Sequence, residues 1–356
     1  MTIIRSILAA IASLFGMLMS VPIILLGFPF WVIAFLTRVF SRLFRKRAIP
    51  WQKIIEFYPT IGWKPKANLN AYALGQDSEI FHFTTDSEGW RGKNNIEKSE
   101  IVVFGDSFAF GFAADDGVFF AELNHKLCIK AIGACGYNMV QSLLWMERLS
   151  SKLKGKLVIW FIYYGNDLYE NLQPNLDHYR MPFVREVNGA GKWEIVTSHI
   201  RPDRWFYTPE RRYYDRLSEI CCRTFLSERA YSACEFLIRK GNDICKDEGA
   251  KLVVMTIPEV TQLNPNGLKL LSSLAPDPAS FDPDLPDKKI SEICLRLDIP
   301  FIALKNHLTV TDYKVRDCHW NEKGHKRIAE VLYSLYQGYL LKNVELFRGH
   351  SIGTEI

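Results

Sequence analysis

The sequence has 356 residues, of which 48% are hydrophobic and 23% charged. This balance predicts a chain that folds around a large core, and it excludes extensive disorder. Six of the 44 basic residues and none of the 39 acidic ones precede Ala48, so the body is close to neutral. A body without excess positive charge speaks against a nucleic-acid partner.

The N-terminal part of the chain has the composition of a membrane anchor. No charged residue occurs between Arg5 and Arg38, and roughly 20 apolar residues cross a bilayer of about 30 Å. We expect residues 6–40 to contact the lipid bilayer and residues 1–47 to form a retained anchor with a basic flank. The stretch is interrupted at Pro22, Gly27 and Pro29. One tilted helix and a bent hairpin are both compatible with this pattern.

The flank after the apolar stretch, RVFSRLFRKR, predicts the side of the membrane. Basic residues next to a span stay preferentially in the cytoplasm. The eight cysteines show no regular framework spacing, which suits a reducing compartment. We therefore expect the body on the cytoplasmic face, with the periplasmic face as the alternative.

The body divides by pattern into three parts. Residues 48–99 are rich in turns and predict a lead-in of short strands and loops. Residues 100–345 alternate apolar β-type runs with helical patterns and predict one α/β domain, and residues 346–356 form a tail. The expected strands are 101–104, 128–132, 156–164, 251–257 and 300–304, and the expected helices lie in 117–127, 139–153, 211–248, 286–297 and 322–342. Such alternation predicts a parallel sheet covered on both faces.

A long insertion, about 168–250, separates the third run from the fourth. Within it REVNGAGKWEIV predicts a hairpin, because Asn188 and Gly189 supply turn chemistry between two β-prone arms. A second stretch, about 258–286, is rich in proline, serine and aspartate and predicts an irregular loop. We expect both to border a pocket, since open α/β sheets bind ligands at the carboxyl ends of their strands.

Polar residues follow these runs where each strand ends. Ser107 follows the first run, Gly136 lies in a glycine-containing loop after the second, and Asn166 follows the third. Near the C-terminus, Asp317 stands two residues before His319 and a helical pattern follows. Each alone is explained by a cap or a turn. In this order, each after a strand, they supply what acyl transfer requires.

The chemistry assigns a role to each residue. Ser107 is the expected nucleophile, His319 the base, and Asp317 the group that orients the imidazole. The Ser107 N–H, the Gly136 N–H and the Asn166 side-chain amide are the expected oxyanion donors. The histidines and cysteines show no pair at zinc-ligand spacing, so we expect no metal and no cofactor.

The segments GDSFAFG, GACGYN, YGND and DCHWNEKGH resemble the successive blocks of the SGNH/GDSL hydrolase family. The resemblance extends from about Glu100 to Gln337. It implies a flavodoxin-like three-layer α/β/α sandwich, with Ser107 as nucleophile, Gly136 and Asn166 as oxyanion donors, and Asp317 with His319 as acid and base.

The acid departs from the commoner family pattern. Many members place it three residues before the histidine, where this chain has Arg316. Asp317 resembles instead the D-x-H-W variant of some bacterial hydrolases and of alginate-type O-acetyltransferases. Asp106, expected to orient the loop around Ser107, is the alternative acid. Two neighbours are expected to lie outside the chemistry, namely Cys318 as a packing residue and His325 as a surface or capping residue.

These observations predict a membrane-anchored serine ester hydrolase that forms a covalent acyl-enzyme. Its expected substrate is a small-molecule or glycan O-acyl ester. One alternative is an O-acyltransferase that modifies a glycan or polysaccharide. Another is a catalytically silent SGNH-like domain that scaffolds other membrane proteins. The sequence leaves the oligomeric state open.

Overall fold

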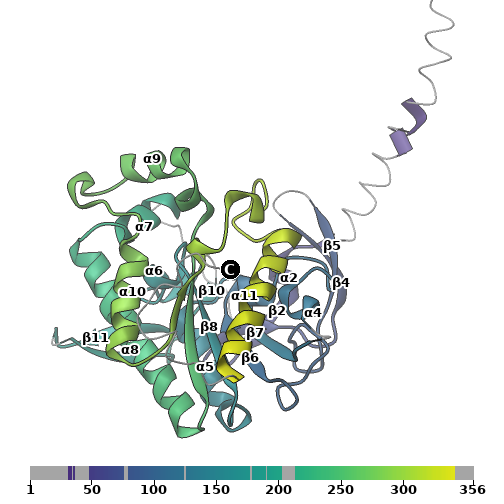
Figure 1. The fold of residues 1–356 in the computed structure, drawn as a ribbon, viewed down its shortest axis with the longest axis horizontal. Coiled ribbons are helices and arrows are strands. Elements are labelled where there is room, and N and C mark those ends of the chain that lie inside the picture. Colours follow the sequence, from purple (N-terminus) through teal and green to yellow (C-terminus); the bar gives the residue numbers. More distant parts are fainter. Residues whose placement is uncertain are drawn as a thin grey trace, which may run out of the picture. The chain divides into compact units, whose positions relative to one another are not determined.

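The structure is a computed structural model, shown as a ribbon in Figure 1. It describes residues 31–33, 35–36, 48–75, 79–123, 126–176, 179–189, 191–202 and 213–340. The chain divides into two units, Met1–Ile49 and Pro50–Ile356. The first contains β1 (Ala48–Ile49), and the second contains the sheet and the site described below.

A five-stranded parallel sheet forms the centre of the second unit. Its strands are β6 (Ile101–Gly105), β7 (Ile129–Gly133), β8 (Leu157–Tyr163), β13 (Lys251–Ile257) and β14 (Phe301–Ala303). They lie in the order β14-β13-β8-β6-β7, and every neighbouring pair is parallel. In chain order this is the flavodoxin-like arrangement 2-1-3-4-5, which reverses direction between its first and third strands. The parallel sheet predicted from the apolar runs is confirmed.

Alternate residues of each strand enter two separate hydrophobic cores. Along β6, Val102 and Phe104 belong to one core while Ile101 and Val103 belong to the other, and all four are buried. Successive side chains of a strand point to opposite faces, so a strand that is apolar throughout needs cover on both sides. This explains why the predicted strands are continuous apolar runs.

Helices supply that cover and complete the three layers (Figure 1). One face packs against α5 (Met139–Arg148), α8 (Phe225–Asp247) and α10 (Leu285–Arg296). The other packs against α3 (Ser107–Phe110), α4 (Phe119–Glu122) and α11 (Glu322–Leu340). Side-chain caps begin two of the long helices: Asn138 opens α5 and Thr224 opens α8, each in a capping box that contributes on the order of 1 kcal/mol.

Three predicted elements differ from the structure. The helical pattern expected in parts of 211–248 is divided between two helices, α7 (Tyr213–Ile220) and α8, because Thr224 caps a new start. The stretch 258–286, expected to be irregular, contains α9 (Pro265–Ser273), which Asn264 caps through the Gly267 N–H. The helix expected within 117–127 is reduced to the short α4. Short 3-10 turns lie at Ser150–Lys152, Val260–Leu263, Pro278–Ser280, Leu304–Asn306 and Val310–Asp312.

Short antiparallel pairs make up much of the rest. Before the sheet, α2 (Trp51–Ile54) is followed by the pairs β2 (Ile55–Tyr58) with β3 (Gly62–Pro65), and β4 (Asn70–Leu74) with β5 (Ile80–Thr84). After β8 come α6 (Asp167–Glu170), the pair β9 (Asn175–Leu176) with β10 (Tyr179–Arg180), and the pair β11 (Phe183–Val187) with β12 (Lys192–Val196). The last pair confirms the predicted hairpin, and Asn188 has the positive φ of 57° that its turn role requires.

Two buried cations connect the lead-in to the rest of the second unit, one through β7 and one through the loop after α3. Lys130, on β7, is 1% exposed, and its Nζ donates to Asp86 at 2.7 Å. Arg91, also 1% exposed, donates to Asp115 at 2.7 Å and to the Ala113 carbonyl at 3.0 Å. A buried charge needs such partners, and breaking one of these pairs would leave an uncompensated ion in the core.

The membrane segment predicted over residues 6–40 falls almost wholly outside the described residues, which include only 31–33 and 35–36 of it. In the part of the chain that the structure describes, no helix combines the length and the apolar character needed to span a bilayer.

Candidate active site

The predicted site residues follow the strands at one edge of the sheet. Ser107 comes directly after β6 and its Asp106, Gly136 follows β7, and Asn166 follows β8. Parallel strands bring their carboxyl ends together, and β6 and β8 are the neighbours between which the strand order reverses. A crevice at that reversal is where open α/β sheets bind their ligands.

Ser107 is held by a tight strand-to-helix turn. Asp106 is the N-cap of α3, and its Oδ1 accepts the Phe108 N–H at 2.8 Å. The turn lies close over β7: a Cβ on Gly133 would come within 2.6 Å of the Asp106 carbonyl oxygen. Only glycine leaves room for the backbone here. As the first residue of α3, Ser107 has an N–H without an intrahelical acceptor.

His319 is positioned by a closed loop before α11. Tyr313 and Trp320 form an isolated antiparallel bridge, and the Lys314 N–H donates to the His319 carbonyl at 3.0 Å. Trp320 is buried in the core that faces α11. Asn321 closes the loop, because its Nδ2 donates to the Tyr313 carbonyl at 2.9 Å and its Oδ1 accepts the Gly324 N–H at 3.0 Å. The tryptophan and asparagine of DCHWN thus anchor the loop that carries the histidine.

The structure brings Ser107, His319 and Asp317 into one hydrogen-bonded chain. His319 Nε2 lies 2.7 Å from Ser107 Oγ, and His319 Nδ1 lies 2.6 Å from Asp317 Oδ1. An ionised carboxylate can only accept hydrogen bonds, so Nδ1 carries the proton that Asp317 accepts. Nε2 is then free to accept the proton of the Ser107 hydroxyl, which is the arrangement a general base needs.

Electrostatics keep Asp317 ionised and increase the proton affinity of the His319 imidazole. Burial alone would raise the pKa of Asp317, but its hydrogen bond with His319, together with the charges of His319 and Lys314, lowers this pKa to about 2. Burial alone would lower the pKa of His319, whereas Cys318 and Asp317 together raise it. Asp317 is the closer of the two, at 2.6 Å from Nδ1 against 3.9 Å for the Cys318 sulfur.

Two aromatic rings hold the imidazole. Phe112 stacks on His319 with ring centroids 4.6 Å apart at 21°, and Phe108 packs 5.1 Å away. Both come from the segment that carries Ser107, so nucleophile and base share one packed cluster. The His319 side chain remains 12% exposed, which keeps the site open to solvent. Sequence reasoning did not single out either phenylalanine, because GDSFAFGF shows apolar residues without showing which ring meets the histidine.

Gly136 adopts the left-handed conformation, with φ of +69°. A Cβ there would lie 2.2 Å from Leu176 Cδ2, so the position excludes larger residues by backbone and by space. Among the described residues, no acceptor takes the N–H of Gly136 or of Ser107. Both amides are available to a ligand at this edge of the sheet.

The side chain of Asn166 is hydrogen-bonded to a buried carboxylate, that of Glu170, which the sequence did not predict as part of the site. Its Nδ2 donates to Glu170 Oε2 at 3.1 Å and lies 3.5 Å from the carbonyl oxygen of Tyr137, the residue after Gly136. Glu170 is 5% exposed and pairs with Arg216 of α7 at 3.4 Å. The four-residue spacing between Asn166, the N-cap of α6, and Glu170 was the available signal, because residues four apart along a helix lie on the same side.

Two further carboxylates lie buried beneath the site. Burial raises the pKa of Asp106 to about 6, against the stabilising bond from the Phe108 N–H. Burial, and secondly the charge of Asp106, raise the pKa of Asp167 well above its usual range. Asp167 Oδ2 accepts the Tyr163 N–H at 2.8 Å and thereby closes the turn that presents Asn166. Asp317, and not Asp106, is hydrogen-bonded to the His319 imidazole.

Two expectations about neighbouring residues need correction. Cys318 packs against the core as predicted, but its sulfur does not point away from the histidine: it lies 3.9 Å from Nδ1. His325, expected at the surface or as a cap, is 1% exposed. Its ring stacks on Phe119 and meets Trp320 edge-on, and among the described residues neither ring nitrogen has a hydrogen-bond partner. It lies three and four residues before the buried Ile328 and Ala329, so it shares the inward face of α11.

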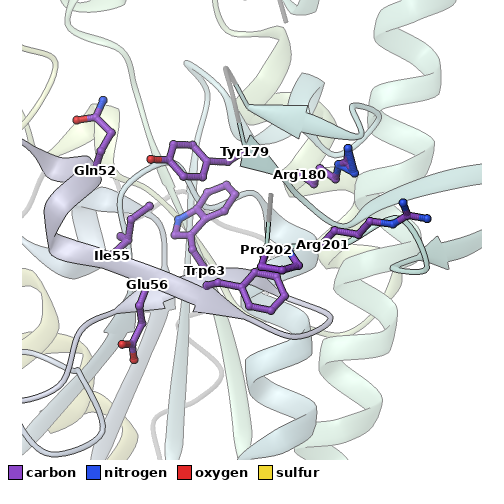
Figure 2. Close-up of a pocket in the computed structure, with 10 residues that line it drawn as sticks. Gln52, Ile55, Glu56, Trp63, Tyr179, Arg180, Arg201 and Pro202 are labelled. Atoms are coloured by element: carbon purple, nitrogen blue, oxygen red, sulfur yellow. The ribbon is translucent and has the colours of Figure 1, made fainter. Parts of the chain in front are cut away.

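A cavity of about 130 Å³ lies against the lead-in, next to the Gly136 loop (Figure 2). Trp63 and Tyr179 form its aromatic side, with ring centroids 5.8 Å apart. Arg180 and Arg201 lie to the right of these rings in Figure 2. The Trp63 indole N–H donates to the Cys135 carbonyl at 3.0 Å, one residue before Gly136. The lining therefore joins the lead-in and the insertion beside an expected oxyanion donor.

Comparison with known proteins finds no matching family model and no matching curated protein. Among solved structures, the chain is similar to a member of the lipolytic G-D-S-L family from Veillonella parvula, at 9% identity over 67% of this chain and 97% of that one, with a TM-score of 0.37. It is also similar to TesA, at 10% identity over 66% and 96%, with a TM-score of 0.35.

Proposed function

We propose that this chain is a membrane-anchored serine ester hydrolase that acts on an O-acyl ester through a covalent acyl-enzyme. The observation that carries the proposal is the chain of hydrogen bonds from Ser107 Oγ to His319 Nε2, at 2.7 Å, and from His319 Nδ1 to Asp317, at 2.6 Å. A serine, a base within hydrogen-bond reach and an orienter of the base form the constellation of nucleophilic acyl transfer.

Acylation begins when His319 Nε2 takes the Ser107 proton as Oγ attacks the ester carbonyl. The oxyanion that forms meets the Ser107 and Gly136 N–H groups. The Asn166 amide adds a third donor when it turns one N–H from the Tyr137 carbonyl, 3.5 Å away, to the oxyanion. Each donor aimed at the oxyanion lowers the barrier by about 3–4 kcal/mol. His319 then gives its proton to the leaving alcohol oxygen as the C–O bond breaks, and the acyl group remains on Ser107.

Deacylation repeats these roles with water. His319 takes a proton from water, the hydroxide attacks the acyl carbonyl, and Ser107 leaves with the proton that His319 returns. The products are a carboxylic acid and the regenerated serine. Every proton transfer uses residues of this chain, so the proposal calls on no cofactor or metal.

We propose further that residues 6–40 bind the lipid bilayer and hold the body at the cytoplasmic face. The described helical piece of this segment supports the first part, because its large apolar side chains are exposed: Trp31, Val32, Ile33, Phe35 and Leu36. The basic flank supports the second. Proteolysis of sealed vesicles from either side, read at the body, tests the placement.

The test of the enzyme proposal uses the full chain in detergent micelles, offered p-nitrophenyl esters of several acyl lengths and a fluorophosphonate probe. Labelling and turnover should disappear in Ser107→Ala and persist in Ser142→Ala, a buried serine on α5 that serves as control. Ester hydrolysis that survives in Ser107→Ala refutes the mechanism. A folded parent that neither labels nor turns over would favour the scaffold alternative.

A second candidate is transfer of the acyl group to a glycan hydroxyl. It is favoured by the cavity beside the Gly136 loop, since aromatic faces such as Trp63 and Tyr179 offer flat apolar surface for a sugar ring, and Arg180 and Arg201 offer donors for its substituents. The assay adds candidate oligosaccharides to the hydrolysis reaction. Acylated glycan, formed at the expense of free acid, would select transfer over hydrolysis.

A further inference from the structure

Three neighbouring side chains around the imidazole present different metal-binding atoms to one point. The carboxylate of Asp317, the sulfur of Cys318 and Nδ1 of His319 all lie within 4.8 Å of one another. The sulfur is 3.9 Å from Nδ1, and the carboxylate Oδ1 is 2.6 Å from it. These atoms lie at the Nδ1 edge of the imidazole, whereas Nε2 meets Ser107.

The spacing is close to what a tetrahedral zinc ion requires. With bonds of about 2.0–2.3 Å, the donor atoms around zinc stand about 3.3–3.6 Å apart. The sulfur and Nδ1, 3.9 Å apart, are already near that separation. The carboxylate oxygen lies only 2.6 Å from Nδ1 and must move away by about 0.7 Å. The ligand types also fit, because thiolate and imidazole are the soft and borderline donors that zinc prefers.

Two of the three side chains reach solvent, whereas the Asp317 carboxylate is buried. Cys318 and His319 are both half-buried, and among the cysteines of the described residues only Cys318 and Cys128 are not fully buried. Lys314, whose charge lowers the pKa of Asp317, is hydrogen-bonded to Glu79 and to the Phe112 carbonyl, which turns its charge toward the lead-in. A divalent ion can therefore approach from the side of Cys318 and His319.

We propose that Asp317, Cys318 and His319 form an inhibitory site for a thiophilic divalent cation such as Zn²⁺, with water as the fourth ligand. The ion takes the lone pair of Nδ1, and the Cys318 thiol gives its proton to solvent. The proton formerly on Nδ1 is transferred through solvent to Nε2, so one proton is released for each ion bound.

Binding at Nδ1 reverses the polarity of the catalytic hydrogen bond. With the proton on Nε2, His319 donates to Ser107 Oγ instead of accepting from it, and the hydroxyl has no base. The carboxylate that oriented the ring is occupied by the ion. The proposed consequence is a reversible off state that leaves the fold and the ester-binding surface unchanged.

Cys318 gives the site its selectivity. Without the sulfur, the ion would meet only a histidine and a carboxylate that already satisfy each other at 2.6 Å. The thiolate adds a strong soft ligand next to them. Ions that prefer oxygen, such as Mg²⁺ and Ca²⁺, should therefore leave the enzyme active.

The test separates metal binding from activity, because the inhibition rests on the proposed hydrolase function while the binding does not. Full-length protein in detergent is titrated with Co²⁺, whose bond to a thiolate gives a near-ultraviolet charge-transfer band, and Zn²⁺ is then added to displace it. The variants are Cys318→Ser and Cys318→Ala, with Cys128→Ser as the matched control and Ser107→Ala as the chemically silent background.

We expect one Co²⁺ per chain with a thiolate band in the parent, in Cys128→Ser and in Ser107→Ala. The Cys318 variants should lack the band and bind Zn²⁺ on the order of 10²-fold more weakly. In the ester assay, Zn²⁺ should inhibit the parent and Cys128→Ser, EDTA should restore the rate, and each Cys318 variant, compared with its own metal-free rate, should resist.

Three results would overturn the site: no thiolate band in the parent, a band that persists without Cys318, or Zn²⁺ inhibition of both Cys318 variants as strong as that of the parent. A Cys318-dependent band in a chain that hydrolyses no ester would support the metal site and refute the hydrolase. A parent chain that shows neither the thiolate band nor ester hydrolysis would refute the metal site and the hydrolase function alike.

Discussion

Replacing Gly136 by alanine tests the conformation of the loop that offers an oxyanion amide. The residue has φ of +69°, and a Cβ would meet Leu176 Cδ2 at 2.2 Å. Gly155 provides a matched control, since it has φ of +68° and nothing within 4 Å of its Cβ position. The two substitutions therefore share the backbone penalty and differ in the steric one.

The magnitudes follow from that comparison. A left-handed alanine costs about 1–2 kcal/mol at either position. At Gly136 the Leu176 methyl must also move: rotation away from its preferred rotamer costs about 0.5–1.5 kcal/mol, and an overlap relieved by backbone movement costs about 1–3 kcal/mol. We expect Gly136→Ala to lower the free energy of unfolding by at least about 0.5 kcal/mol more than Gly155→Ala does.

Turnover should separate the two variants more widely. A backbone shift that removes the Gly136 N–H from the oxyanion costs on the order of 10²–10³ in rate, whereas Gly155→Ala should keep the parental rate. Urea denaturation and p-nitrophenyl ester hydrolysis measure the two effects. Adding Leu176→Ala to Gly136→Ala should recover part of the stability. Equal stability and equal turnover of the two alanine variants would refute the reasoning.

Three further predictions concern carboxylates and a buried imidazole. Asp317→Asn should reduce kcat about 10⁴-fold because it favours the wrong imidazole tautomer, whereas Asp106→Asn keeps its capping oxygen and should lose far less; the reverse order would exchange their roles. Glu170→Ala should lower kcat with little change in KM, by up to about 10²-fold, and the loss should vanish in an Asn166→Ala background; additive losses would contradict a positioning role. Burial lowers the pKa of His325 from the usual 6.5 of histidine to about 3, so the unfolded chain binds more protons between these pH values and stability falls as pH decreases. From pH 7 to pH 5 this loss is about 2 kcal/mol, and urea denaturation of His325→Leu should show that much less acid sensitivity.

The sheet and the central part of the site were predictable because both depend on local patterns. Runs such as 156–164 are apolar at every position, which specifies a strand covered on both faces. Ser107 and Asn166 follow two such runs, so parallel pairing alone directs them to one edge. The closed loop before α11 then supplies His319 and Asp317 to the same place.

What could not be predicted depends on contacts between distant segments. Glu170 matters because Arg216 and Asn166 surround it, and Trp63 lies against the Gly136 loop from 73 positions earlier in the chain. The prediction for His325 was wrong because a polar side chain is usually exposed to solvent, whereas this one packs against the aromatic rings of Phe119 and Trp320. The anchor and the domain boundaries remain predictions.

Ser107 and His319 lie 212 positions apart, and each is set by a different part of the fold. The serine turn requires β6 and β7, whereas the histidine loop requires Trp320 to be buried beneath α11. A partly folded chain therefore presents a hydroxyl with no base, and such a serine is as unreactive as any other. In the proposed mechanism Ser107 becomes reactive only when the last loop docks, so labelling by a serine-directed probe would report the completion of folding itself.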